Sequence, residues 1–394
     1  MAGRDRGHLR YLALAGLVAL LWWQTDMTLP PDLGGWRPAA LPGELVYDLA
    51  EIEGDRYAAA HTGLYDLSGE EPAEPFGDLP TPVVRIAQDG KAVLAGTYHG
   101  IYRLGVEGDV SLDGLAEQRV NDLAHSASRW LAATDDGAYE RVEGDWVRRW
   151  PLDEDARVLT IAGWEGGLLV GTRDGITRVD LDREVAEQAW EGEVVRSLIP
   201  DDRDEQAGRI WAGIVEGDVL LASDDDGRSW EAAGDGIRLL SAQDVRSDPA
   251  DPDRLVVGGT GVDDGELLGG VMTSEDGGRT WESEPNRLSN THVYRLAVDR
   301  EPLTVTVGWP FTARATSVVL PVDITRFRAA TNGAGVYTFA DPPTALSMLA
   351  TLQPAVRVVE PLVVGGIFLA LVWQLARISG PVAGSRSRDT GSRS

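Results

Sequence analysis

Histidine, tyrosine and aspartate side chains recur at turns of this chain, where their chemistry suits ligand binding. Three of the five histidines, His61, His99 and His292, stand at such turns or just before an apolar run. Neutral imidazoles beside the carboxylates of Asp135 or Asp136 could ligate a transition metal. The alternative is that these are ordinary polar residues of exposed turns, so the metal is left unknown. The candidate ligand-binding residues are His61, Tyr98, His99, Asp135, Asp136 and His292.

No catalytic residue is assigned, because no catalytic motif is found. The chain has no G-x-S-x-G nucleophile elbow and no glycine-rich phosphate loop between a strand and a helix. It has no cysteine, which excludes disulfides and thiolate metal sites. Acidic clusters at Asp201, Asp248 and Val262 could bind Ca²⁺, but none has EF-hand spacing, and solvated loop carboxylates are the simpler expectation. No cofactor is predicted.

A repeated apolar phrase indicates which elements must position these turns. It reads V-Y-D-L-A at Val46 and V-N-D-L-A at Val120, and successive copies are 37, 37, 38, 37, 47 and 51 residues apart. Such a period, built on short strands with glycine turns, is typical of propeller blades. We therefore predict an all-β, seven-bladed propeller over residues 34–340. The phrases begin at Val46, Val83, Val120, Val158, Val195, Ala242 and Val293.

The order of strands within a blade predicts which loops meet. Turns between second and third strands lie at the same end of the ring as the connections into the next first strand. The candidate ligand-binding residues fall in these segments, so we expect them on one face, called here the top face. The run G-G-W-R-P-A at Gly34 belongs to no repeat, and we expect it to complete the seventh blade and close the ring.

Two turns in the fifth and sixth blades share a second motif. S-D-D-D-G-R-S-W and S-E-D-G-G-R-T-W match the Asp-box, so the chain resembles BNR-type propellers, such as the photosystem-II assembly-factor type and the ligand-binding domain of sortilin. The G-T-x-x-G-I repeats of the first four blades are instead similar to WD40- and YVTN-like sensor propellers. The resemblance covers roughly residues 34–340. It implies a structural role for Ser223, Asp225, Gly227, Trp230, Ser274, Asp276, Gly278 and Trp281.

Sialidases also carry this motif, so the resemblance raises a hydrolase hypothesis. Those enzymes combine an arginine triad, a Tyr–Glu nucleophile pair, an acid aspartate and an early Arg-Ile-Pro motif. This chain has no Arg-Ile-Pro, and Tyr98 has no evident glutamate partner in the sequence. A glycosidase with two carboxylates across the mouth of the ring stays an alternative, although no such pair is singled out.

The net charge of the chain limits the classes of partner that it can bind. Its formal net charge is −27, from 63 acidic and 36 basic residues. Such a surface repels nucleic acid, so no nucleic-acid partner is predicted. Lys91 is the only lysine, which favours a halophilic protein whose self-repulsion is screened by salt. A GC-rich genome that encodes an acidic protein is the alternative.

Both ends of the chain carry an apolar stretch. After a basic leader, residues 1–10, we predict a transmembrane signal-anchor helix at 11–26. A helical linker at 342–353, a second transmembrane helix at 356–378 and a disordered basic tail at 379–394 follow the propeller. Arginines beyond both stretches indicate cytoplasmic termini and an extracellular propeller at the cell membrane. A cleaved signal peptide is the alternative for the first stretch, and a buried or interfacial helix for the second.

These observations favour a membrane-anchored extracytoplasmic propeller that acts as a non-enzymatic protein-binding or assembly module. One rival is an extracellular glycan or peptide hydrolase with its site on the top face. Another is a sensor whose tail contacts a cytoplasmic partner. A hydrolase should present converging carboxylates on the top face, whereas a binding module should present an apolar or aromatic patch there.

Overall fold

The structure is a computed structural model in which every regular element of the described residues is a strand. It describes residues 26–28, 36–69, 75–105, 108–126, 128–150, 157–164, 166–181, 183, 185–201, 209–249, 251–263, 266–283, 288, 292–308 and 315–340. The predicted leader, linker and tail lie outside these residues, as do both anchors except Asp26. Asp26 is the first residue of strand β1 (Asp26–Thr28). Within the described residues no helix is long and apolar enough to cross a membrane.

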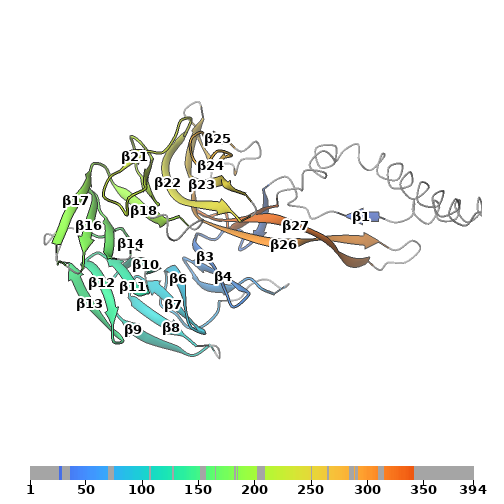
Figure 1. Cartoon of the computed structure of the whole chain (residues 1–394). Helices are drawn as coiled ribbons and strands as arrows, with labels where there is room; N and C mark the ends of the chain where they lie inside the picture. The colour runs from blue at the N-terminus through green and yellow to red at the C-terminus, as the bar shows by residue number, and fades with distance from the viewer. Residues whose placement is uncertain are drawn as a thin grey trace, which may run out of the picture. The chain divides into compact units, whose positions relative to one another are not determined.

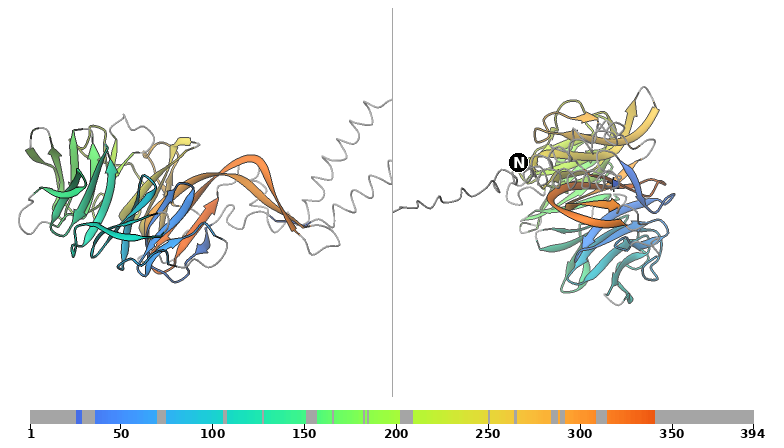
Figure 2. Two further views of the ribbon diagram at one scale, coloured as in Figure 1. Left: turned by 90° about the horizontal axis from the view of Figure 1, so that it is seen from below. Right: turned by 90° about the vertical axis from the view of Figure 1, so that its right-hand side faces the viewer.

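Seven antiparallel sheets follow one another along the chain, which confirms the predicted seven-bladed propeller. Each first strand begins at or near a repeat phrase, and neighbouring first strands contact each other. Figure 1 shows the first strands β3, β6, β10, β14, β18 and β22 toward the inside and the fourth strands β9, β13, β17, β21 and β25 on the outer rim. Figure 2 shows the same blades from two further sides.

The first three blades are β3 (Val46–Ile52), β4 (Asp55–Ala60) and β5 (Gly63–Asp66); β6 (Val83–Asp89), β7 (Ala92–Thr97), β8 (Gly100–Leu104) and β9 (Val110–Gly114); and β10 (Val120–Ser126), β11 (Arg129–Thr134), β12 (Gly137–Val142) and β13 (Asp145–Trp150). The next three are β14 (Thr160–Trp164), β15 (Gly167–Gly171), β16 (Gly175–Asp180) and β17 (Val185–Glu191); β18 (Val195–Pro200), β19 (Ile210–Ile214), β20 (Leu220–Ser223) and β21 (Glu231–Ala232); and β22 (Leu239–Asp248), β23 (Asp251–Asp263), β24 (Glu266–Ser274) and β25 (Glu282–Ser283). The seventh combines β26 (Val293–Gly308), β27 (Ala315–Thr331), β28 (Val336–Ala340) and β2 (Arg37–Ala40).

The N-terminal strand closes the ring as the sequence predicted. β2 pairs antiparallel with β28, and Arg37 lies opposite Thr338. The preceding Trp36 is 8 % exposed, and its ring stacks on Phe339 with centroids 5.7 Å apart. The last blade is therefore completed by residues from the other end of the propeller, so no outer edge of β28 is left unpaired.

Small residues in the second strands allow neighbouring blades to pack closely. Ala58, Ala59 and Ala60 of β4 are fully buried. A Cβ on Gly96 of β7 would lie 2.9 Å from Val120 in the next blade, so a larger residue is excluded there. The core consists of apolar clusters between adjacent blades, in which each fully buried leucine or valine contributes about 1.5–3 kcal/mol.

The chain divides into two compact units. One contains residues Pro31–Glu301 and Asp323–Asp341, and it holds the seven blades. The other combines Met1–Pro30, Pro302–Val322 and Pro342–Ser394. In this second unit β1 pairs antiparallel with β26, and Met27 lies opposite Val307. The described part of residues 309–322 belongs to strand β27, which begins at Ala315.

Candidate functional site

A repeated irregularity of the innermost strands shapes the top face. In five blades the pairing between first and second strands skips the second residue of the repeat phrase. Such a bulge leaves that residue unpaired and changes the direction of its side chain. The skipped residues are Tyr47, Val84, Asn121, Arg196 and Gln243. In the two remaining blades Leu159 and Tyr294 hold the same place in the phrase. None of the seven is acidic, although the chain has 63 acidic residues.

Aromatic rings from three consecutive blades gather there. The rings of Tyr47 and Tyr294 lie 5.7 Å apart, and the ring of His292 stacks on Tyr294 at 6.2 Å. Tyr47 Oη lies 3.5 Å from Nδ1 of His61. Burial raises the pKa of Tyr47 to about 12, and the nearby Tyr98 and Tyr294 phenols add to the effect. We call Tyr47, His61, Tyr98, Arg119, Arg196, His292 and Tyr294 the central cluster.

Two arginines border these rings. The guanidinium of Arg119 lies 4.0 Å from the centre of the Tyr98 ring, and its Nη2 donates a hydrogen bond of 2.9 Å to Tyr98 Oη. Burial raises the pKa of Tyr294, while the positive charge of Arg196 acts in the opposite direction. Among the described residues, neither Arg119 nor Arg196 has a carboxylate partner within ion-pair distance. The central cluster therefore combines exposed guanidinium groups with tyrosine rings in an otherwise acidic protein.

The structure brings together only some of the residues expected on the top face. His61, Tyr98 and His292 belong to the central cluster, whereas His99 faces Glu117, with Nδ1 and Oε2 4.0 Å apart. Asp135 accepts a hydrogen bond of 2.9 Å from Asn121 and lies 3.8 Å from Arg157.

Asp136 is likewise engaged locally. It accepts a hydrogen bond of 2.8 Å from Tyr139 Oη and lies 3.7 Å from Arg148. Within the described part of the chain, no group of three or more His, Cys, Asp or Glu side chains is arranged to hold a metal ion. The carboxylates of the expected site therefore bind neighbours instead of facing the histidines.

Three of the four tyrosines and arginines that the sequence analysis missed occupy the same place in the repeat phrase. Tyr47, Arg196 and Tyr294 all occupy the second place of a repeat phrase, and Arg119 immediately precedes one. Comparison of the seven phrases at that single place would have found three of the four.

The third residues of the phrases, which directly follow the second-place residues, form a ring of buried or partly buried polar groups. Arg85 donates a 2.8 Å hydrogen bond to Asp122 of the next blade. Asp122 in turn accepts from Thr160 Oγ1 at 2.7 Å, and the hydroxyl of Thr160 accepts from the backbone of Leu198 at 3.1 Å. We call the set the third-position ring: Asp48, Arg85, Asp122, Thr160, Ser197, Asp244 and Arg295. It links successive innermost strands and so supports the central cluster.

Opposite charges keep Asp122 and Arg295 of this ring ionised. Burial acts to raise the pKa of Asp122, but the charges of Arg85 and Arg295 and a hydrogen bond from Thr160 outweigh it and lower the pKa. Burial acts to lower the pKa of Arg295, but Asp48, Asp244 and Asp122 outweigh it and raise the pKa. Ser197 departs from the pattern, because its buried Oγ has no hydrogen-bond partner within the described part of the chain.

The turns with the S-x-D-x-G motif are internally hydrogen-bonded. Ser223 Oγ donates to Asp225 at 2.8 Å and accepts from the backbone of Gly227 at 2.9 Å. Ser274, Asp276 and Gly278 repeat both distances in the next blade. Hydrogen bonds from the Thr280 hydroxyl and backbone lower the pKa of Asp276 to about 2. Both turns connect third and fourth strands and contain no residue of the central cluster.

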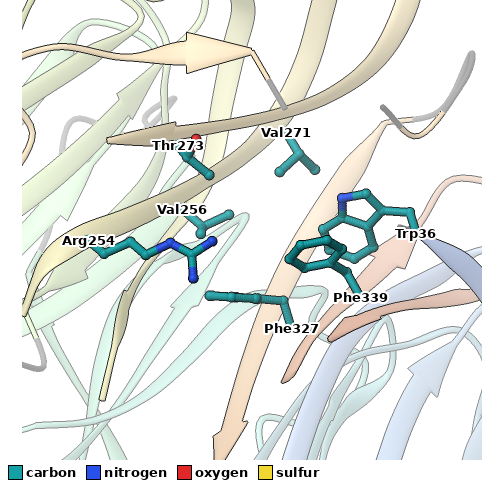
Figure 3. A pocket seen from close by; sticks show the side chains of 7 residues that line it. All are labelled: Trp36, Arg254, Val256, Val271, Thr273, Phe327 and Phe339. Carbon is teal, nitrogen blue, oxygen red and sulfur yellow. The ribbon is translucent and has the colours of Figure 1, made fainter. Parts of the chain in front are cut away.

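A narrow crevice with no room for a water molecule lies between the sixth and seventh blades. Figure 3 shows Arg254 over the Phe327 ring, with Trp36 and Phe339 face to face beside it. The indole N–H of Trp36 finds no acceptor among the residues that the structure describes. The crevice shares no residue with the central cluster, and its walls are mainly the apolar core that joins β2 to the ring.

Comparisons with known proteins give a likeness in structure only. No protein-family model matches the sequence, and no curated protein matches it. The extracellular domain of a putative hybrid two-component system from B. thetaiotaomicron has a TM-score of 0.56 at 13 % identity, over 77 % of this chain and 39 % of that one. This chain therefore spans about two fifths of the length of that domain.

Three further structures match at similar levels. YCF48 from Cyanidioschyzon merolae has a TM-score of 0.53 at 13 % identity, over 78 % of this chain and 99 % of that one, and YCF48 bound to a D1 peptide has 0.52 at 12 %, over 80 % and 100 %. The GH74 enzyme of Niastella koreensis has 0.52 at 12 %, over 78 % of this chain and 53 % of that one. The likeness is one of fold. It confirms the expected resemblance to propellers of the YCF48 type.

Proposed function

We propose that this protein is a membrane-anchored extracytoplasmic β-propeller that binds a protein partner through the central cluster. The observation that carries the proposal is the presence of Tyr47, Tyr98 and Tyr294 beside Arg119 and Arg196. Tyrosine and arginine are the residue types enriched at the energetic centres of protein interfaces, because both offer large contact areas and polar tips. Such a patch on the top face is what a binding module should present.

Two of the structural matches support the proposed binding function. One is YCF48 with a bound peptide, and the other is an extracellular domain of a sensor system. Both are propellers that share the fold of this chain. The terminal apolar stretches supply the proposed anchors, and the arginines beyond them favour an extracellular propeller at the cell membrane.

Affinity purification from membranes in high salt tests the proposal. The wild-type chain should recover a stoichiometric protein partner. The double variant Arg119→Ala/Arg196→Ala should lose it, because it removes two guanidinium groups that form no ion pair among the described residues. Arg228→Ala is the matched control, since this exposed arginine lies in the Ser223–Trp230 turn outside the cluster. Equal recovery by the double variant would show that the partner binds elsewhere.

The alternative function is an extracellular glycan or peptide hydrolase, which the likeness to the GH74 enzyme favours. It requires two free carboxylates, whereas Asp135 and Asp136 are engaged by Asn121, Arg157, Tyr139 and Arg148. Consistent recovery of the wild-type protein alone, together with turnover of a glycan or peptide panel, would favour the hydrolase.

Protease treatment of intact cells tests the location. An extracellular propeller should be digested while a cytoplasmic marker survives. Protection of both would overturn the proposed topology.

A further inference from the structure

The parts of β26 and β27 that belong to the second compact unit differ in composition from the rest of the chain. We call Pro302–Gly308 and Ala315–Val322 the distal hairpin. Between Glu301 and Asp323 only Arg314 is charged, whereas 25 % of the whole chain is. A soluble surface usually keeps a charged fraction of about 25–35 %, so the distal hairpin is unusual for a segment that faces water.

The sequence alternates along the first of these strands. Leu303, Val305 and Val307 occupy every second position, and Thr304 and Thr306 lie between them. Because successive residues of a strand belong to opposite faces, β26 has an apolar face and a threonine face in this part. Met27 of β1 lies opposite Val307, and Thr28 lies opposite Thr306. Met27 therefore extends the apolar face, and Thr28 extends the threonine face.

The pairing of β1 also locates the distal hairpin along the chain. Asp26 lies opposite Gly308, and the residue before Asp26 ends the uncharged apolar stretch of Tyr11 to Thr25. If that stretch is the first membrane anchor, a charged residue at its end belongs at the bilayer surface. Residues paired across antiparallel strands have Cα atoms only about 4.5–5.5 Å apart, so Gly308 must lie at the same surface.

From these observations we propose that the apolar face of the distal hairpin, together with β1, binds the interfacial layer of the lipid bilayer beside the first anchor. The inference rests on the membrane anchor of the proposed function. The partner is the bilayer and not a second protein, because the strand is tied to the end of the anchor and because the segment lacks charge. An apolar strand face of this kind gains free energy by leaving water for the boundary between headgroups and acyl chains.

Single-cysteine labelling tests the contact, since the natural chain has no cysteine. The full-length variants Val305→Cys, Leu303→Cys, Thr306→Cys and Lys91→Cys are labelled with an environment-sensitive fluorophore. They are then reconstituted in phosphatidylcholine–phosphatidylglycerol vesicles in high salt. Lys91 is the control, because it lies in an exposed turn of the second blade. Retention in the vesicles after an alkaline wash reports on the anchor independently.

We expect the labels at Val305 and Leu303 to emit at shorter wavelength and to lose most of their fluorescence to lipid-borne nitroxides. The label at Lys91 should be quenched by iodide in the water instead. Thr306, on the other face of the same strand, should be quenched less by the lipid nitroxides than Val305. Equal quenching at Val305 and Thr306, or iodide access at Val305 and Leu303 equal to that at Lys91, overturns the inference while the anchor stands. Loss of the protein from the vesicles overturns the anchor and the inference together.

Discussion

Arg295 donates a hydrogen bond of 2.8 Å from Nε to Oδ1 of Asp48, which joins the innermost strand of the last blade to that of the first. The same guanidinium lies 3.6 Å from Asp244 of the sixth blade. The ring is therefore closed twice: by β2 at the rim and by this ion pair at the centre. Both closures connect residues from opposite ends of the propeller sequence.

Substitution of Arg295 by methionine should destabilise the propeller by about 3–5 kcal/mol, because it leaves the buried carboxylate of Asp48 without its cation and leaves Asp244 with Arg246 alone. The free energy of unfolding from denaturant titration measures the loss. Arg228→Ala is the comparison, since its pairing with Asp226 is exposed and should be worth less than about 1 kcal/mol. Equal losses would mean that the central ion pair does not hold the ring closed.

The third-position ring should also make stability sensitive to acid. The pKa of Asp122 is lower in the folded chain than its ordinary value. Its contribution is therefore complete above the unfolded pKa and is lost as the pH falls through the folded one. We expect the free energy of unfolding to decrease below about pH 4. Asp122→Asn should make this decrease shallower in denaturant titrations at successive pH values. An unchanged slope in the variant would exclude Asp122 as a source of the acid sensitivity.

Most of the fold could be predicted because a propeller repeats its local rules. The spacing of the repeat phrases was enough to predict the seven sheets. Trp36 and its neighbours could be assigned to the last blade, because the repeats left that blade one strand short. What the period could not give is the third-position ring. The contact between Arg295 and Asp48 becomes visible only when the first and last blades are placed side by side.

The candidate site was predicted less well, for a physical reason. Turn residues such as His61 and Tyr98 can be assigned to a face from strand order alone. Tyr47 and Tyr294 read as ordinary strand residues, because the bulge that leaves Tyr47 unpaired is a feature of strand pairing and not of composition. Asp135 and Asp136 looked available in the sequence, but their partners Arg157 and Arg148 follow them by more than ten residues.

The central cluster should show itself in an alkaline titration. Burial, followed by Tyr98 and Tyr294, raises the pKa of Tyr47 from 10.0 to about 12. A group whose pKa is raised on folding stabilises below its unfolded pKa, and this stability is lost as the pH rises through the folded value. Stability should therefore fall between these two values, and Tyr47→Phe should remove part of the fall. Phenolate absorbance measures the titration. The wild type should contain one tyrosine with a raised pKa that the Tyr47→Phe variant lacks. Identical phenolate titration curves for the two proteins would mean that the ring of Tyr47 is not buried among the other rings.

A pair of glycines separates backbone strain from packing. Gly278 and Gly144 both have positive φ, at +93° and +100°, so alanine at either costs about 1–2 kcal/mol. A Cβ on Gly144 would meet nothing within 4 Å, whereas one on Gly278 would lie 2.7 Å from the ring of Trp211.

Trp211 cannot easily move away, because it is 3 % exposed and its indole N–H donates to Asp201 at 3.3 Å. Gly278→Ala should therefore lower the free energy of unfolding by about 1–3 kcal/mol more than Gly144→Ala. Denaturant titrations of the two variants measure the difference. Equal losses would mean that the turn at Gly278 is held by its backbone conformation alone and that its contact with the neighbouring blade contributes nothing to stability.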